Sequence, residues 1–283
     1  MAMEQALDGR LATPPAFSLL GAAAVVDLEQ GGDLRLENGY SVDSETCGAS
    51  GAAGGLCAPS AALPAITAPS DGYTARPFLV HAGDICTAMD LRRDGNAKAR
   101  RLLLASQAES IEAELHDGTV SRAQAYGNPF LRDSATVTDL TPASGPVGPK
   151  GSLAILEARL AECRTRSTIH ASIVGALHLP DVTASGRTWT TKLGSLVVPG
   201  TGYTGTGPIG HAQETPPAGQ TWIYGTGIVD VVLGRIEDGQ VAINRDTNTA
   251  ESRALRLAVA GFDPCCHYAI RMVLATDENL PAA

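Results

Sequence analysis

WIYGTGIVDVVL at Trp222–Leu233, INRDTNT at Ile243–Thr249 and ALRLAVAGFDPCCHYAIRMVL at Ala254–Leu274 form the closing stretch of the chain. Its apolar runs are rich in β-branched residues and are divided by turn chemistry, with Gly234 in one gap and Asp246 in the next. This pattern predicts that the chain ends in paired strands and not in helices. The stretch carries no His, Cys, Ser or carboxylate at a spacing that catalysis demands, so it favours a structural role.

The composition limits the class of protein. The chain has 283 residues, of which 44% are hydrophobic, and its net charge at pH 7 is −9. This length and apolar content allow one large domain or two of ordinary size. The acidic balance disfavours a protein that must neutralise phosphates along DNA or RNA. The apolar run Ala16–Val26 is too short to span a bilayer and lacks the basic lead of a secretory signal, so we expect a protein made and kept in the cytosol.

One long helix is predicted in the middle of the chain. Asp94 or Asn96 can cap a helix that runs to about His116, and Gly118 is placed to stop it. At 1.5 Å per residue the helix is roughly 30 to 35 Å long. Its expected apolar face consists of Leu104, Ala108, Ile111 and Leu115.

The charges of this helix are set against its own dipole. Basic residues crowd its N-terminal end, namely Arg92, Arg93, Lys98, Arg100 and Arg101. Acidic residues crowd the other end, namely Glu109, Glu112, Glu114 and Asp117. Such a helix is suited to meet complementary charges on identical copies or adjoining subunits. The alternative, that these are solvated surface charges only, remains open.

Shorter elements surround the helix. Segments 34–42 and 73–80 are strand-like, and the tract between them is long and rich in Gly, Ala, Ser and Pro. A loop of that length is normally mobile or ordered by something outside its own fold, which a neighbouring subunit can supply. Two shorter helices are predicted later, one with Leu153, Leu156 and Leu160 on one face and one from Ser167 or Thr168 to Pro180. A strand follows at residues 193–198.

A glycine pattern raises the possibility of a nucleotide site. Gly200, Gly202 and Gly205 match G-x-G-x-x-G directly after a strand. A dinucleotide site needs a helix to open at this turn, and here Pro208 and Pro216 follow instead. We therefore predict a surface loop. The chain also has no Gly-x-Ser-x-Gly elbow and no Walker pattern, so we expect no catalytic, cofactor-binding or metal-binding residues.

Cysteines and histidines give no stronger indication of chemistry. The six cysteines, at positions 47, 57, 86, 163, 265 and 266, show no Cys-x-x-Cys spacing, and we do not expect a disulfide scaffold in a chain of this length. Cys265, Cys266 and His267 are adjacent, but neighbouring side chains on a strand point to opposite faces, so we interpret them as buried structural residues. His170 and His178 are interpreted as ordinary residues of the second short helix.

The order of the predicted elements carries a family resemblance. It is supported by LGSLVVPGTGYTG at Leu193–Gly205, by the Tyr224–Gly227 turn that leads into VDVVLG, by INRDTNT, and by the corner Asp263–His267. On these motifs the chain resembles the major capsid protein of tailed bacteriophages, the Hong Kong 97 fold shared with encapsulin shells. It is most similar to the capsid proteins of phages that infect actinobacteria, over about residues 75–275.

The resemblance implies an α+β, Hong Kong 97-like capsid fold in five parts. These are an N-terminal arm at residues 1–33, an extended loop with flanking strands at 34–80, a peripheral domain at 81–145 with a spine helix at 94–117, an axial domain at 146–220, and closing strands at 221–283 that return to the peripheral domain. The loop is expected to lie over a neighbouring subunit, and the axial domain to surround each pentamer and hexamer centre.

The resemblance further implies a non-enzymatic protein without a cofactor, which assembles as hexamers and pentamers into the icosahedral head shell around phage double-stranded DNA. Implied partners are other copies of itself and portal, scaffolding and decoration proteins, with no sequence-specific DNA binding and no membrane. The implied location is the virion, after assembly in the host cytoplasm. Alternatives are an encapsulin-like compartment shell and a hydrolase or redox enzyme that uses Cys86, Cys265 or Cys266.

Two sets of candidate residues accompany this hypothesis. Cys47 and Cys57 flank the Gly/Ala-rich part of the loop and are a candidate disulfide, formed after release from the reducing host. The isopeptide cross-links of the founding member of the fold require a lysine, and the chain has none at residues 34–80. Candidate inter-subunit charge contacts are Arg92, Arg93, Arg100, Arg101, Glu109, Glu112 and Glu114.

Overall fold

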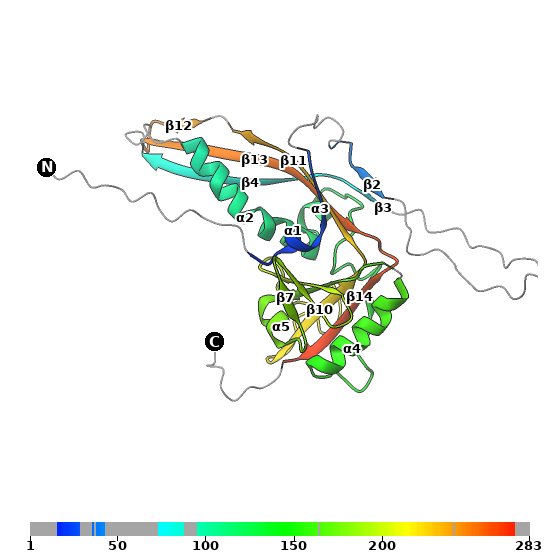
Figure 1. Cartoon of the computed structure of the whole chain (residues 1–283). Coiled ribbons are helices and arrows are strands. Elements are labelled where there is room, and N and C mark those ends of the chain that lie inside the picture. Colours follow the sequence, from blue (N-terminus) through cyan, green and yellow to red (C-terminus); the bar gives the residue numbers. More distant parts are fainter. Residues whose placement is uncertain are drawn as a thin grey trace, which may run out of the picture.

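The computed structural model describes residues 16–28, 36, 38–42, 73–87, 95–163, 165–239 and 241–274, with the side chains of residues 86 and 87 excepted. The described chain forms an elongated lobe, at the top of Figure 1, and a compact lobe below it. Each lobe is built around its own β-sheet. Cys47, Cys57, Arg92 and Arg93 lie outside the described residues.

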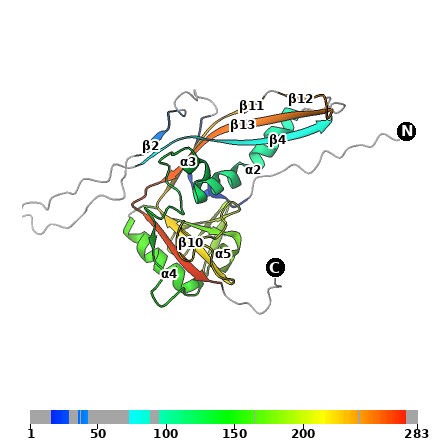
Figure 2. The ribbon, with the colours of Figure 1, turned by 180° about the vertical axis from the view of Figure 1, so that it is seen from behind.

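The elongated lobe is a long sheet with one helix along it. Its strands are β1 (Ala24–Asp27), β4 (Phe78–Thr87), β11 (Val229–Asp238), β12 (Ala242–Asn244) and β13 (Thr249–Phe262). β13 pairs antiparallel with β4, β11 and β12, and β1 pairs parallel with β11. Helix α2 (Gly95–Asp117) runs along one face of this sheet, as both views show (Figures 1 and 2).

The sequence of β13 explains which face the helix covers. Ser252 and Arg256 are buried on the same face as the alanines Ala250, Ala254 and Ala258, whereas the alternate residues 249, 251, 253, 255 and 257 are more exposed. Since side chains alternate along a strand, these small residues form one face on which a helix can approach closely. The predicted helix at 94–117 is confirmed from residue 95. Its buried face contains Leu103, whereas the predicted Leu104 is 39% exposed.

A two-stranded hairpin base covers the inner end of the other sheet face. It consists of β2 (Tyr40–Val42) and β3 (Tyr73–Ala75), paired antiparallel. Its Tyr73 hydroxyl donates a hydrogen bond to Asp230 Oδ2 at 3.0 Å, and its apolar side chains pack with Val232 and Val259. The outer part of this face has no covering element among the described residues.

The compact lobe is a seven-stranded sheet between helices. In spatial order its strands are β5 (Thr138–Asp139), β14 (His267–Val273), β10 (Gln220–Thr226), β6 (Thr168–Ser172), β9 (Leu196–Gly200), β8 (Thr188–Thr190) and β7 (Thr183–Ser185). One face packs against α4 (Pro149–Leu160), the 3₁₀ turn η3 (Ala161–Cys163) and α5 (Ile173–His178). The opposite face packs against the C-terminal half of α2 and the short helix α1 (Leu19–Ala22). Helix α3 (Thr119–Ala123) follows α2 directly.

The structure corrects two expectations about these elements. The closing strands do not all return to one domain, because β11, β12 and β13 join the long sheet whereas β10 and β14 join the compact sheet. The helix predicted from Ser167 or Thr168 to Pro180 is strand β6 followed by α5. β6 has only five residues and passes directly into α5, so the two were interpreted as one element. The strand predicted at 193–198 is observed as β9, shifted to 196–200.

Candidate functional site

The described part of the chain shows no arrangement typical of an active site. It contains no group of three His, Cys, Asp or Glu side chains that could hold a metal ion. No helix in that part has the length and apolar character to cross a membrane. A groove of about 520 Å³ beside β3 is lined by Thr74, Arg76, Pro77, Ala125, Tyr126 and Gly127, which include neither a carboxylate nor an imidazole.

Three histidines are buried where the two lobes meet, and their ring nitrogens are used for internal hydrogen bonds. His170 contacts the Tyr203 hydroxyl and Thr226 Oγ1, each at 2.9 Å. His267 contacts the Leu131 carbonyl oxygen at 2.9 Å and Thr136 Oγ1 at 3.1 Å. His116 contacts Asp117 Oδ1 at 3.0 Å, and its ring lies near those of Tyr203 and Tyr224. His116 brings α2 against the tyrosines of the compact lobe, and His267 ties β14 to the segment after α3, whereas both hydrogen bonds of His170 stay within the compact lobe.

Burial holds these histidines in the neutral form. It lowers the pKa of His170 to about 3 and that of His267 to about 4, and it lowers the pKa of His116 as well. Buried neutral imidazoles are poor general acids or bases, and in His170 and His267 both ring nitrogens are also occupied by hydrogen bonds. The structure therefore uses them for packing. His170 lies in strand β6, so the prediction that it is a helix residue was wrong.

Glu112 is an internal anchor and not a surface charge. Its side chain is fully buried, with Oε1 accepting a hydrogen bond from the Leu19 amide at 2.8 Å and Oε2 accepting one from the Gly202 amide at 3.1 Å. Burial raises the pKa of its carboxyl group, against the opposing effect of these hydrogen bonds. It thus ties the N-terminal segment and the loop after β9 to α2. The expectation that it contacts another subunit is corrected.

Gly202 explains part of the glycine pattern that resembled a nucleotide site. A Cβ at this position would lie 2.5 Å from both the Ala113 nitrogen and the Glu109 oxygen of α2. The chain therefore needs glycine here because its backbone touches the backbone of the helix. No helix follows this turn, as predicted, and the next regular element is β10.

Glu114 is likewise internal. It is buried, and its carboxylate accepts hydrogen bonds from the Val120 amide at 2.8 Å, the Ser121 amide at 2.8 Å and the Ser121 hydroxyl at 2.6 Å. It therefore satisfies free amides at the start of α3, where the residue before the helix is Gly118 and has no side chain to cap it. The expected inter-subunit contact of Glu114 is corrected for the same reason.

The remaining helix charges are at the surface. Arg101 and Glu109 are exposed. Arg100 is also exposed and forms a two-pronged ion pair with Asp238 of β11, at 2.6 and 2.9 Å. The expected separation of surface charge along α2 is thus retained only in part, because the carboxylates of Glu112 and Glu114 at its acidic end are buried.

One buried and one partly buried arginine, not singled out in the sequence, link distant segments. Arg256 of β13 is buried and donates to the Gly234 carbonyl oxygen, to Gln107 of α2 and to Asp27 of β1. Arg132 donates to Asp117 at 2.6 Å and to the Gly207 carbonyl oxygen at 2.8 Å, and it pairs with Glu214. Isolated charges in a sequence give no signal for such long-range contacts.

One disulfide is formed between cysteines that were not paired in the sequence interpretation. Cys163 and Cys266 are bonded, with a Cα–Cα distance of 5.8 Å and a sequence separation of 103. Both are buried, so the expectation that Cys266 is a buried structural residue is confirmed. The sequence interpretation expected no disulfide scaffold and did not foresee this bond. Cys265 is exposed and is also disulfide-bonded, so its predicted burial is wrong.

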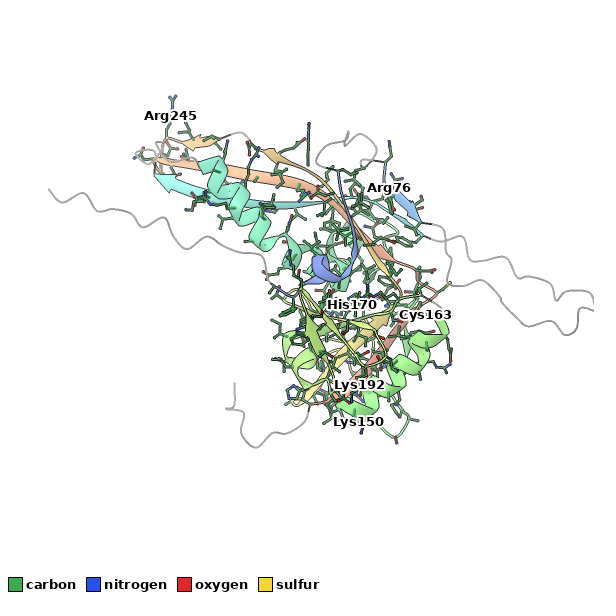
Figure 3. All side chains as sticks on the ribbon, viewed as in Figure 1. Arg76, Lys150, Cys163, His170, Lys192 and Arg245 are labelled. Carbon is green, nitrogen blue, oxygen red and sulfur yellow. A yellow bond between two sulfur atoms is a disulfide. The ribbon has the colours of Figure 1, made fainter. Side chains whose placement is uncertain are left out.

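Apolar side chains are exposed on both lobes. On the open face of the long sheet, Leu79 is 52% exposed and Ile85 is 69% exposed. On the compact lobe, Ile173, Val174 and Leu177 of α5 share an outward side and are 45 to 67% exposed. Figure 3 shows the extent of the molecule between these surfaces, with Arg245 at the far end of the elongated lobe and Lys150 and Lys192 at the far end of the compact lobe.

Known structures identify the fold. No protein-family model and no curated protein matches the sequence. The structure is similar to the capsid of an empty GTA particle, with a TM-score of 0.55 and 13% identity, over 96% of this chain and 95% of that chain. For the capsid of the native GTA particle the TM-score is 0.52 and the identity 12%, over 96% and 95%.

A compartment shell gives a similar match. The SrpI encapsulin from Synechococcus elongatus PCC 7942, in its holo complex, has a TM-score of 0.52 and 12% identity, over 94% of this chain and 90% of that chain. The chain has a Hong Kong 97-like capsid fold. The α+β class and this fold, both expected from the sequence, are confirmed. Within this fold, the groups described above join segments of the same chain, whereas the apolar side chains of β4 and α5 are exposed.

Proposed function

We propose that this chain is the major capsid protein of a tailed bacteriophage, and that it assembles as hexamers and pentamers into an icosahedral head shell around double-stranded DNA. The proposal is supported by the capsid fold and by the absence, in the described part of the chain, of a cluster of groups suited to chemistry. The exposed apolar surface on both lobes is the observation that carries it.

These surfaces lie on opposite parts of the molecule. Leu79 and Ile85 lie on β4 in the elongated lobe, and Val174 and Leu177 lie on α5 in the compact lobe. A soluble monomer rarely leaves several apolar surfaces open, because each one favours association. A subunit that contacts several neighbours in a closed shell needs more than one such surface.

The parts of the fold receive roles under this proposal. The elongated lobe acts as the peripheral domain with α2 as its spine helix, and the compact lobe acts as the axial domain around each pentamer and hexamer centre. The loop between β2 and β3 lies over a neighbouring subunit. The surface charges of α2, namely Arg100, Arg101 and Glu109, contact adjoining subunits together with Arg92 and Arg93.

The net charge of −9 agrees with the enclosure of DNA. A basic lining would retain the incoming duplex through phosphate contacts and counterion release, whereas a neutral or acidic lining leaves it mobile. The protein therefore holds DNA without sequence-specific binding. Its further partners are portal, scaffolding and decoration proteins, its place is the virion after assembly in the host cytoplasm, and its host is an actinobacterium. A disulfide between Cys47 and Cys57 belongs to the same proposal.

A second candidate is an encapsulin-like compartment shell. The similarity to the SrpI encapsulin, with a TM-score of 0.52, favours it nearly as much as the similarity to the GTA capsids favours the phage shell. The two candidates differ in content, since a compartment encloses a protein cargo whereas a phage head encloses a genome.

Expression of the full chain followed by negative-stain microscopy tests the shell function. Closed particles of uniform size are expected, and a protein that stays monomeric at high concentration would refute the proposal. Particles purified from phage-producing cells, treated with nuclease before opening, should contain protected double-stranded DNA. A stoichiometric protein cargo in place of DNA would favour the compartment.

A matched pair of variants tests the compact-lobe surface. Leu177→Asp places a charge on a side chain that is 67% exposed, so we expect a folded subunit that no longer assembles. Leu177→Met keeps the surface apolar and should assemble as the unchanged chain does. Normal particles from Leu177→Asp, detected by analytical ultracentrifugation, would remove α5 from the assembly contact.

A further inference from the structure

The chain passes between the two sheets at two adjacent crossings. The first runs from Thr226 at the end of β10 to Val229 at the start of β11, and the second runs from Phe262 to His267. Val229 pairs with Phe262 in the long sheet, and Thr226 pairs with His267 in the compact sheet. The crossings are therefore side by side, and together with the packing of the C-terminal half of α2 on the compact sheet they form the joint between the lobes.

The Cys163–Cys266 disulfide lies at this joint. Cys266 belongs to the second crossing, and Cys163 ends η3, which continues α4 along the compact lobe. Figure 3 shows Cys163 at the end of the compact lobe that adjoins the elongated lobe. The bond thus fastens a crossing segment to a helix of one lobe, and it spans 103 residues of sequence.

The surroundings of the bond are closely packed. A Cβ at Gly227, in the first crossing, would lie 3.0 Å from Thr165 Oγ1 and 3.8 Å from Cys266 Cβ. The Cys266 amide donates to the Asp263 carbonyl oxygen at 3.1 Å, and the rings of Phe262 and His267 meet edge to face at 4.8 Å. The bond therefore acts on both crossings at once.

We propose that Cys163 and Cys266 form a redox-controlled lock on the joint between the two lobes. With both thiols reduced, the crossings can bend and the lobes can change their mutual angle. With the disulfide formed, the second crossing is fixed to η3 and the angle is set. The lock concerns the joint itself, whereas the moment of its closure, when an assembled particle leaves a reducing cytosol, rests on the proposed function.

The chemistry needs an external oxidant, for which a small-molecule disulfide is sufficient. One cysteine thiolate attacks that disulfide and forms a mixed disulfide with release of one small thiol. The second cysteine thiolate then attacks the mixed disulfide and releases the other small thiol. The two cysteines lose two protons and two electrons, and the small disulfide is reduced to two thiols.

The reduced chain can reach the same fold. Both cysteines belong to the apolar cluster that includes Leu160 and Ile270, and a thiol in such a place behaves as a small hydrophobic side chain. The sulfur atoms are also shielded, since Cys163 is 5% exposed and Cys266 is 1% exposed. Once closed, the lock should therefore be reduced only slowly unless the joint opens.

Hydrogen exchange on the full chain tests the lock. The protein is treated with oxidised glutathione or with dithiothreitol, and backbone exchange is followed by mass spectrometry at residues 226–229 and 262–267. We expect exchange there to be about tenfold or more faster after reduction, which corresponds to about 1.4 kcal/mol of local stability, with little change in the centre of β10. Equal exchange in the two states would overturn the proposal.

Variants separate this bond from other effects of the reductant. Cys163→Ala should exchange at the joint like the reduced chain in both conditions. Cys265→Ser removes the disulfide of Cys265 and leaves the Cys163–Cys266 bond intact, so it should keep the difference. If Cys163→Ala does not fold, the comparison of oxidised with reduced Cys265→Ser decides the matter. Complete alkylation of Cys163 in the glutathione-treated protein, under denaturing conditions without reductant, would also overturn the lock. Microscopy of the same samples scores particle formation separately, so a lack of shells counts against the proposed function only.

Discussion

The two sheets differ in how many of their faces the subunit covers. In the compact lobe, all five residues of β9 and six of the seven in β10 are buried, because α4 and α5 cover one face and α2 and α1 the other. In the elongated lobe, β13 alternates between buried and less buried residues along most of its length, because α2 covers one face and the outer part of the other is open.

This difference separates the sheet faces that one chain covers by itself from the sheet face that it leaves exposed. A strand buried on both faces usually has a continuous apolar sequence, whereas a strand with one covered face alternates between apolar and polar residues. The compact lobe therefore holds its sheet by its own core, whereas the elongated lobe exposes a sheet face that a neighbour can cover. Substitutions on the two sheets should have very different effects on the isolated subunit.

The largest effect is expected in the core of the compact lobe. Leu156 of α4 is fully buried against the sheet, so Leu156→Ala should lower the free energy of unfolding by about 2–5 kcal/mol. Urea unfolding, followed by the fluorescence of Trp189 and Trp222 in unassembled subunits, measures it. Leu156→Met keeps the volume and should cost less than about 1.5 kcal/mol. A small loss for both variants would mean that this core is loosely packed.

Acid should weaken the junction between the lobes. Burial lowers the pKa of His170 to about 3 and that of His267 to about 4. As the pH falls below 6.5, these two imidazoles therefore take up protons in the unfolded chain before they do so in the folded chain. The stabilisation is therefore complete above pH 6.5 and declines below it, by about 2–3 kcal/mol for the two residues between pH 7 and pH 5.5. Asp117, whose pKa His116 and Arg132 lower to about 2, extends the loss below pH 4.

Unfolding in urea at pH 7.0, 6.0 and 5.5 measures this decline. His170→Asn removes one titrating group and should make the dependence on pH shallower, although the variant is less stable at pH 7. His81→Asn changes an exposed imidazole on β4 and should leave the dependence as it is. A stability that is constant between pH 7.0 and 5.5 would contradict the neutral, buried state of these histidines.

A smaller effect is expected where α2 passes into α3. Glu114→Ala leaves the buried amide of Ser121 and the part-buried amide of Val120 without an acceptor, which should cost about 1–3 kcal/mol. Glu109→Ala removes an exposed carboxylate of the same helix and should change stability by less than about 0.5 kcal/mol. Equal losses in chemical denaturation would show that Glu114 acts through its charge alone and not as a cap.

The smallest effect on the isolated subunit is expected on the open sheet face. Leu79→Ala shortens a side chain that is 52% exposed, so the free energy of unfolding should fall by less than about 1 kcal/mol. In the proposed shell the same change should raise the protein concentration at which particles first form, as measured by light scattering. A large loss of stability without an effect on assembly would show that this face is covered within the subunit.

The sequence predicts the regular elements best where their pattern has a single explanation. Helix α2 lies between candidate capping residues and the stop at Gly118, and the closing strands are rich in β-branched residues, so both were found within a few residues. The resemblance then supplied the fold, because the order of the motifs carries information that no single motif has. β6 and α5 were merged into one helix, since β6 has only five residues and continues into α5 without an intervening turn.

The internal links could not be predicted from local patterns. Cys163 and Cys266 are 103 residues apart, and connectivity among several cysteines does not follow from their spacing. Glu112 and Glu114 resembled surface charges because an acidic run is usually solvated. Their burial depends on the compact lobe and on α1 and α3, which pack around the C-terminal half of α2. No local motif in the sequence indicates that contact.

The contact at Gly202 limits the motions that the two lobes can make. Its backbone fits among Glu109, Glu112 and Ala113 of α2 with no space for even one additional carbon. A change of tilt about this point leaves the fit intact. If the loop slid along the helix by one residue, about 1.5 Å, Gly202 would meet a different set of helix atoms. The loop would first have to separate from the helix. Any rearrangement of the subunit should therefore be a rotation about a fixed pivot and not a translation.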